Sequence, residues 1–375
     1  MVDVTKISNG GRKRVRIGVV APLTGRAAQL GVEMAQAVEL AVEDANDKAD
    51  GIVFESIPRD DKGDEAEGAK VASSLIADAQ VMGIVGHYNS NVTLAVAQSY
   101  CDASMPLISP IVSNPKLTDA GWDNVFRFTN RDDVTGSAIS DYLTAELGKR
   151  RAVVVRTNTV YGNSMTDEFV HAFRRRSGSV LADVAVEEGN SEFGVLVKSF
   201  PKDIDMVFYG GTFEGAPLLK AMRAAKCGHL LATGDGCWDG WNFLEPAGEA
   251  AEQDEGVLVL SACPQIGVVQ ESREFAQRYC DRFGPLKNYA VNCYDAAAQL
   301  LEAVRLAKRG NWLNREGVIS ALRQSPYRGI AYPDVVKWDA RRDNIAAMTA
   351  LHVVEKGRFK QVRMIARTTE TSALE

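Results

Sequence analysis

Residues 81–118 read VMGIVGHYNSNVTLAVAQSYCDASMPLISPIVSNPKLT, and this stretch decides how the rest of the chain is interpreted. An apolar run, Val81–Val85, is followed by a polar loop and then by a helical pattern. A second apolar run, Pro106–Ser109, breaks at Pro110 and leads into another polar loop. Two such crossings in succession predict neighbouring strands of a parallel α/β sheet, whose carboxyl edge is where ligands bind.

Two serines follow these runs, and we expect Ser90 and Ser113 to lie side by side at that edge. Each comes where a helix start or a turn leaves backbone N–H groups free, and hydroxyls beside such groups can hold an anion. We therefore predict that this edge holds a carboxylate. Two plainer readings remain: Ser90 caps the helix that begins near Asn91, and Ser113 only serves the turn before Asn114–Pro115.

Composition describes a globular protein: 375 residues, 46% hydrophobic and 25% charged, with a net charge of −6. The length predicts two domains. Lysine and arginine are scattered, which argues against a nucleic-acid partner, and no apolar run is long enough to span a bilayer. Six cysteines and four histidines lack metal-site spacing, and the charged loop Asp60–Asp64 lacks the calcium-loop pattern, so it is read as a solvated loop. No metal or cofactor is predicted.

Strands alternate with helices from the start of the chain, which predicts parallel α/β architecture. The alternation of strands and helices begins twice, and polar segments at 129–133 and 261–264 mark the predicted boundaries, or seams, between the halves. Later helices and strands are predicted to complete both halves. The predicted strands are 15–20, 52–57, 81–85, 106–109, 124–128, 152–156, 180–186, 205–209, 230–233 and 257–261, with short pieces at 335–338, 348–354 and 361–365. The helices predicted in the second half and after it are 134–148, 163–176, 191–199, 215–226, 270–283, 289–308 and 314–323.

Six motifs occur in a fixed order: VRIGVVAPLTGRAAQLGVEMAQAVELAVEDAN, GIVGHYNSN, LISPIVSNPKLT, VYGNS, VFYGG and TGDG. From about Arg14 to Ile365 the chain resembles the branched-chain amino-acid-binding proteins, the extracytoplasmic solute receptors of ABC importers. The resemblance implies a type I periplasmic-binding fold, in which three crossovers join two Rossmann-like lobes around a ligand cleft. It implies a first lobe of 14–130 plus 263–336, a second of 131–262 plus 337–366, a third crossover near 336–338, and flexible tails at 1–13 and 367–375.

By position, the resemblance also assigns roles to five residues. It implies that Ser90 and Ser113 bind the ligand carboxylate, that the Ile111 carbonyl accepts from the ammonium, that Tyr161 closes the site, and that Asp235 faces the ammonium. The chemistry agrees, because a zwitterion leaving water needs both of its charges paired. The plainer readings are that Asp235, between two glycines, is a turn residue and that Tyr161 is surface packing.

Departures from the family pattern concern the ligand side chain. Relatives often have an aromatic residue before the glycine of Leu30–Gly31 and another at Thr212. Tyr88 and Phe213 are the residues that we expect to line this part of the pocket, with Trp238 as a further candidate or a core residue. An apolar or aromatic side chain is therefore predicted for the ligand.

The predicted function is that of a monomeric, non-enzymatic receptor that delivers an amino acid to the permease subunits of an ABC transporter. Catalytic motifs such as GxSxG, HExxH and the phosphate loop are absent from the sequence. No secretory signal is visible, so we expect a periplasmic protein whose signal was removed. The alternatives are a cytoplasmic ligand sensor of the same fold, and a receptor for an aromatic acid, amide or urea-like solute.

Overall fold

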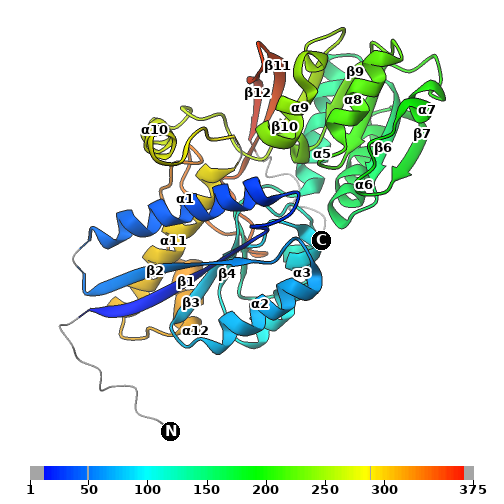
Figure 1. Ribbon diagram of the computed structural model, residues 1–375. Helices are drawn as coiled ribbons and strands as arrows, with labels where there is room; N and C mark the ends of the chain where they lie inside the picture. Colours follow the sequence, from blue (N-terminus) through cyan, green and yellow to red (C-terminus); the bar gives the residue numbers. More distant parts are fainter. Residues whose placement is uncertain (1–11, 49, 288, 367–375) are drawn as a thin grey trace.

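The computed structural model describes residues 12–48, 50–287 and 289–366, which form two lobes, each built on its own sheet (Figure 1). The tails predicted at 1–13 and 367–375 lie outside the described residues, except for Arg12 and Lys13, and Lys13 opens the first strand. The sheet of the first lobe is parallel throughout, in the order β2-β1-β3-β4-β5. Its strands are β1 (Lys13–Ala21), β2 (Ile52–Asp60), β3 (Val81–Gly86), β4 (Leu107–Ser109) and β5 (Val125–Arg127).

Helices cover both faces of this first sheet. One face packs against α1, α10, α11 and α12, and the other against α2, α3 and α4. The helices of the first lobe are α1 (Ala28–Asn46), α2 (Glu65–Ala77), α3 (Ser90–Asp102), α4 (Lys116–Asp119), α10 (Glu271–Phe283), α11 (Ala290–Arg309) and α12 (Arg315–Gln324). The last three come late in the sequence, so the first lobe is completed by chain that has already passed through the second (Figure 1).

The sheet of the second lobe has the order β12-β11-β10-β9-β8-β6-β7. Its central strands are parallel, and β11 and β12 are added antiparallel at one edge. The strands are β6 (Arg151–Thr157), β7 (Ser179–Val186), β8 (Met206–Gly210), β9 (Leu230–Thr233), β10 (Val257–Ser261), β11 (Met348–Glu355) and β12 (Arg358–Ala366).

Helices cover both faces of the second sheet as well, α5 and α6 on one side and α7, α8 and α9 on the other. They are α5 (Asp132–Asp141), α6 (Val160–Arg175), α7 (Gly194–Lys198), α8 (Gly215–Ala224) and α9 (Glu245–Ala247). Short helical turns complete the lobe: η1 (Tyr142–Glu146), η2 (Asp235–Cys237), η3 (Gly240–Leu244) and η4 (Gly248–Ala251).

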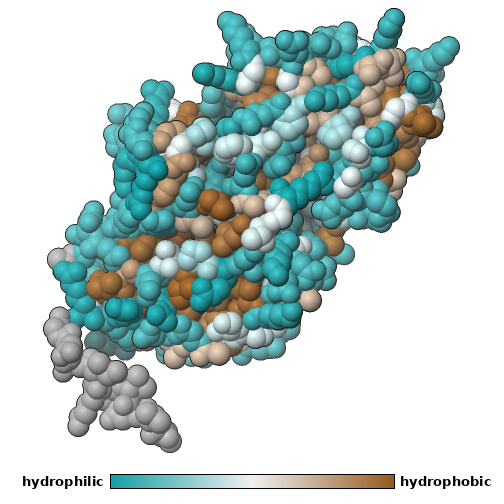
Figure 2. All heavy atoms as spheres, viewed as in Figure 1, coloured by the Kyte–Doolittle hydropathy of each residue, from teal (hydrophilic) through white to brown (hydrophobic). Residues whose placement is uncertain are grey.

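Burial explains why these segments take these forms. The runs that form β8 and β10 are buried at every residue, as strands covered on both faces must be. In α1 the apolar residues Met34, Ala37, Val38, Ala41 and Ala45 recur at helical spacing, and these five face the core. On the face shown in Figure 2, hydrophilic residues cover most of both lobes, and hydrophobic residues show as separate patches.

Three crossovers join the lobes, and the third lies later in the chain than predicted. The first two fall between β5 and α5 and between β10 and α10, at the predicted seams. The stretch predicted as the third, Val336–Trp338, still belongs to the first lobe, because the Trp338 ring packs 5.1 Å from that of Phe126. Asp343 forms an isolated β-bridge with Arg127 of β5. The chain therefore enters the second lobe only between Asp343 and β11. The predicted strand at 335–338 is reduced to isolated bridges.

Candidate functional site

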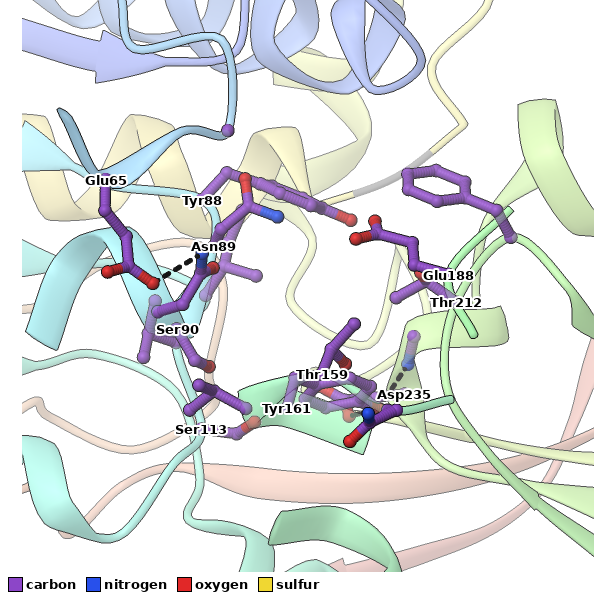
Figure 3. Close-up of a pocket in the computed structure, with 18 of the residues that line it drawn as sticks. Glu65, Tyr88, Asn89, Ser90, Ser113, Thr159, Tyr161, Glu188, Thr212 and Asp235 are labelled. Atoms are coloured by element: carbon purple, nitrogen blue, oxygen red, sulfur yellow. Dashed lines mark hydrogen bonds between the residues drawn. The ribbon is translucent and has the colours of Figure 1, made fainter. Parts of the chain in front are cut away.

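A cavity of about 290 Å³ lies between the two lobes, and all seven predicted ligand-binding residues line it (Figure 3). Loops at the carboxyl ends of strands from both sheets supply most of its wall. The ligand-binding roles of these residues stay a prediction, but their convergence is a structural fact. The wall consists of Gly63, Glu65, Tyr88, Asn89, Ser90, Asn91, Ile111, Val112, Ser113, Asn158, Thr159, Val160, Tyr161, Glu188, Thr212, Phe213, Asp235, Gly236 and Tyr289.

In the first lobe, Ser90 is the first residue of α3, and Asn89 holds the N-cap position. The reading of Ser90 as the cap is therefore wrong. No side chain caps this helix end, so its first-turn amides remain available to an anionic group in the cavity. Ser90 is only 5% exposed.

Ser113 lies in the loop that follows β4, with Ile111 beside it in the wall. The local turn is made by the neighbouring residue, because Asn114 Oδ1 accepts a hydrogen bond from Lys116 N at 3.0 Å. The Ser113 carbonyl oxygen accepts from Asp132 N at 2.9 Å. Turn formation therefore does not account for the Ser113 hydroxyl, which lies at the cavity beside the Asp132 carboxyl.

In the second lobe, Asp235 and Tyr161 form a pair. Tyr161 Oη donates to Asp235 Oδ1 at 2.6 Å and accepts from Gly236 N at 2.8 Å. A Cβ at position 236 would lie 2.8 Å from the Tyr161 ring and 2.5 Å from the Gly211 carbonyl oxygen, so only glycine fits after the acid. Asp235 is 5% exposed. Asp235 is the first residue of the turn η2, but its side chain also pairs with Tyr161, and both residues line the cavity.

The electrostatics of the cavity around Asp235 favour a positively charged ligand group. Burial raises the pKa of Asp235 to about 6, although the hydrogen bond from Tyr161 lowers it. A carboxyl that is costly to ionise in a buried site is stabilised by a cation placed beside it. The Asp235 end of the cavity therefore suits an ammonium group.

A second acid, Asp132, lies behind the wall at the start of α5. Burial raises its pKa to about 7, repulsion from Asp235 adds to the rise, and the hydroxyls of Ser164 and Ser113 oppose it. Ser164 Oγ donates to Asp132 Oδ2 at 2.5 Å. Two neighbouring buried acids make this end of the site strongly electronegative when both are ionised.

The side-chain region of the wall is formed by Tyr88, Phe213 and Thr212. Phe213 packs with Ala27 and Leu30 of the first lobe, so Leu30 supports the pocket from behind. Arg26 lies 4.6 Å from the centre of the Phe213 ring.

Several wall residues were not predicted. Asn158, Thr159 and Glu188 follow the ends of β6 and β7, so the strand-end rule that singled out Ser90 also applied to them. Tyr289 precedes a helix of the returning segment and carried no such signal; its hydroxyl donates to the Asp235 carbonyl oxygen at 3.2 Å.

Two other sequence readings concern residues outside the wall. Trp238 does not line the cavity and packs behind it, 4.8 Å from the Tyr289 ring. Asp61 is not solvated as the loop reading implied, because it is fully buried and its Oδ2 lies 2.7 Å from His87 Nδ1. Among residues 12–48, 50–287 and 289–366 there is no cluster of metal-ligating side chains, and no helix there is long and apolar enough to cross a membrane.

A two-lobed α/β chain with three crossovers and a polar cavity between the lobes defines a class of ligand-binding proteins. The family model described as periplasmic binding protein matches residues 14–358, and the chain belongs to that family. Leu/Ile/Val-binding protein homolog 1 of Brucella melitensis is 28% identical over 298 residues, 78% of each chain. Leu/Ile/Val-binding protein BraC3 of Rhizobium johnstonii is 25% identical over 314 residues, 82% of this chain and 83% of that one.

Solved structures share the fold. The branched-chain amino acid transporter substrate binding protein LivJ of Streptococcus pneumoniae, in complex with isoleucine, has a TM-score of 0.84 at 23% identity, covering 94% of this chain and 99% of that one. A solute binding protein of R. palustris in complex with benzoate has a TM-score of 0.83 at 21% identity, covering 95% and 97%. These comparisons confirm the predicted resemblance and the type I periplasmic-binding fold. The family and these neighbours are substrate-binding proteins.

Proposed function

We propose that this protein is the solute receptor of an ABC importer and binds a small α-amino acid as a zwitterion between its lobes. One observation carries the proposal: hydroxyls and free helix amides on the first lobe face a buried acid on the second across one cavity. Ser90 and Ser113 take the carboxylate, Asp235 takes the ammonium, and the carbonyl of Ile111 accepts a further bond from it. The names of the relatives support an amino-acid ligand.

The division of labour between the lobes links binding to closure. Each lobe supplies partners for only one ligand charge, so the ligand is fully paired only when the lobes are together. A ligand that prefers the closed form in this way shifts the population toward it. A permease recognises such a closed, loaded receptor. By kinship with the family we place this step outside the cytoplasmic membrane, with a monomeric receptor and no chemical conversion of the solute.

Calorimetry with a panel of aliphatic, aromatic, polar and charged amino acids tests the proposal. We expect at least one α-amino acid to bind with a micromolar or tighter Kd, and its N-acetyl and amide derivatives, which lack one of the two charges, to bind far more weakly. Failure of every amino acid in the panel would overturn the proposal. Mass spectrometry of solute released from the purified protein provides an independent check.

A receptor for an aromatic acid is the second candidate, because one structural neighbour holds benzoate. Such a ligand would use Ser90 and Ser113 but would leave Asp235 without a cation. Benzoate in the same calorimetric panel distinguishes the two candidates: tight binding of benzoate without binding of any amino acid would favour the second.

A further inference from the structure

The charged residues of the cavity wall are all acids. Among the residues that the structure describes, Glu65, Glu188 and Asp235 line the cavity, and no lysine, arginine or histidine does. Arg26, which lies 4.6 Å from the centre of the Phe213 ring, is engaged by Glu214 at 2.6 Å. The α-ammonium of an amino acid neutralises the charge of Asp235 only, and the α-carboxylate brings a further negative charge into the cavity. If the ligand side chain is neutral, the loaded cavity therefore holds more negative than positive charge.

Glu188 is the acid that faces the side-chain region. It lies in the loop between β7 and α7, and its carboxylate points into the cavity on the side of Tyr88 and Thr212, away from Ser90 and Ser113 (Figure 3). Glu65 lies at the opposite side and accepts a hydrogen bond from Asn91. Only Glu188 is therefore placed to meet the tip of a ligand side chain.

The backbone around Glu188 is fixed, although its side chain is exposed to solvent. Gly189 N donates to Glu214 Oε1 at 2.8 Å, and Asn158 N donates to the Val186 carbonyl oxygen at 2.8 Å. No hydrogen bond or ion pair joins the Glu188 carboxylate to any other residue in the described part of the chain. An anchored acid without a protein partner, aimed into a ligand cavity, is available to a cationic group of the ligand.

The part of the cavity wall between the Asp235 end and Glu188 suits the hydrocarbon stem of a ligand side chain. Tyr88, Ile111 and Phe213 line it, and lysine-like side chains bury their methylene groups along such surfaces while the charged tip stays near water. Aromatic faces also attract ammonium and guanidinium groups. Tyr88 and Phe213, on which the prediction of an apolar or aromatic ligand side chain was based, are thus equally suited to the stem of a basic one.

We propose that the solute is an α-amino acid whose side chain ends in an ammonium or guanidinium group, with Glu188 as the residue that selects it. This inference rests on the proposed function and differs from the apolar or aromatic side chain predicted from the sequence. Asp235 recognises what all amino acids share, and Glu188 recognises the additional positive charge.

Lysine and norleucine provide the test, because they share a stem and differ in the terminal ammonium. Kd values are measured by calorimetry for both, and for ornithine, arginine, leucine and phenylalanine, with the wild type, Glu188→Gln and Glu187→Gln. Glu187 is a matched control: it is adjacent and exposed, and it does not line the cavity. We expect the wild type to bind at least one basic amino acid about tenfold or more tightly than its neutral counterpart.

We expect Glu188→Gln to lose that preference while its affinity for norleucine stays within about twofold, and Glu187→Gln to behave as the wild type. Tighter binding of leucine, norleucine or phenylalanine than of every basic amino acid would overturn the inference and leave the proposed function standing. Equal losses for lysine and norleucine in Glu188→Gln would also overturn it. Absence of binding by any amino acid would instead overturn the proposed function itself.

Discussion

Asp235 is the residue that we expect to make ligand binding depend on pH. Its pKa is raised to about 6 by burial, and only its ionised form pairs with an ammonium group. As the pH falls through 6 the acid becomes protonated, so the affinity falls by up to about tenfold for each further pH unit. Calorimetry from pH 8 to pH 5 measures this directly.

The variant Asp235→Asn separates this acid from other sources of pH dependence. We expect it to bind at least about thirtyfold more weakly at pH 8, because truncating one partner of a buried charge pair costs about 2–5 kcal/mol, and to lose the part of the pH dependence that is centred near pH 6. Asp60→Ala is the control, since Asp60 accepts from Leu23 N and the Thr24 hydroxyl and does not line the cavity. Intact affinity in Asp235→Asn would remove Asp235 from the site.

We expect the raised pKa of Asp132 to affect the stability of the ligand-free protein. Its pKa rises to about 7 in the folded protein from an ordinary value of 3.8, so the folded state binds more protons than the unfolded state between these two values. The carboxyl therefore favours folding at low pH, and this contribution is lost as the pH rises through about 7. Asp132→Asn, whose amide oxygen can still accept from Ser164, should raise the free energy of unfolding at pH 8 by about 1 kcal/mol or more.

Urea unfolding at pH 8 and at pH 5 measures this effect. At pH 5 the wild-type acid is already largely protonated, so we expect the difference between Asp132→Asn and the wild type to shrink. A variant that is destabilised equally at both pH values would show that Asp132 is held by structural contacts rather than strained by its charge.

The sequence could place the residues proposed to bind the two ligand charges, but only part of the side-chain region: Tyr88 and Phe213 were predicted there, and Glu188 was not. Ser90 and Ser113 follow neighbouring strands of the first sheet, so strand order brings them to one edge. Asp235 follows β9 of the second sheet and meets them only because the two lobes face each other across the cavity. Glu188 also follows a strand, yet an exposed acid in a polar loop looks the same in the sequence whether it faces solvent or a cavity. Tyr289 reaches the site through packing against the second lobe, which no local pattern records.

At the scale of elements, a strap formed by residues 336–344 is held on β5 by a buried ion pair. Arg127 is fully buried, and its Nε donates to Asp343 Oδ1 at 2.8 Å. Its Nη1 also donates to the carbonyl oxygens of Val112 and Asn114, at 3.0 and 2.8 Å. The same arginine therefore fixes the strap that precedes the third crossover and the loop that contains Ser113.

Arg127→Met should destabilise the protein by about 3–5 kcal/mol, because it leaves the Asp343 carboxylate buried without its main partner. Urea unfolding measures the change. Arg341→Met is the matched control in the same strap: Arg341 is 56% exposed and lies 3.7 Å from an Asp119 oxygen, so its loss should cost at most about 1 kcal/mol. Equal losses in the two variants would show that the strap does not depend on the buried pair.

The elements that could be predicted are those with an unambiguous apolar pattern. The predicted strand at 230–233 coincides with β9 and that at 257–261 with β10. The helix predicted at 191–199 shrinks to α7 (Gly194–Lys198), because apolar residues in this short segment do not extend to a full amphipathic stripe. The third crossover was misplaced because Val335–Trp338 looks like a strand, whereas its tryptophan fills the core of the first lobe.

At the scale of the whole molecule, the lobes touch each other beside the cavity as well as through the crossovers. Lys287, just before α11, pairs with Glu245 of the second lobe, and its ammonium lies 3.6 Å from the centre of the Trp241 ring. Arg26 of the first lobe reaches Glu214 and Phe213 of the second. These contacts join the two lobes through protein side chains.

The Arg26–Glu214 contact is the contact between the lobes that mutation can test most cleanly. Glu214 is fully buried and already accepts bonds within its own lobe, from Gly189 N at 2.8 Å, Tyr209 Oη at 3.0 Å and Thr157 Oγ1 at 3.1 Å. The second lobe therefore holds this carboxylate in place by itself, and closure adds a charge-assisted bond from Arg26 at 2.6 Å. Such a contact favours the closed form without touching the ligand.

Arg26→Gln should increase the open population and so weaken the apparent affinity for every ligand by the same factor, about three- to tenfold, because apparent affinity scales with the fraction of competent protein. Calorimetry measures that factor, and small-angle scattering without ligand should show a larger radius of gyration than in the wild type. Arg278→Gln is the control, since Arg278 pairs with Asp44 inside the first lobe at 2.7 Å. Unchanged affinity and size in Arg26→Gln would show that the crossovers and the ligand alone determine closure, whereas a loss confined to one ligand would place Arg26 in the side-chain region.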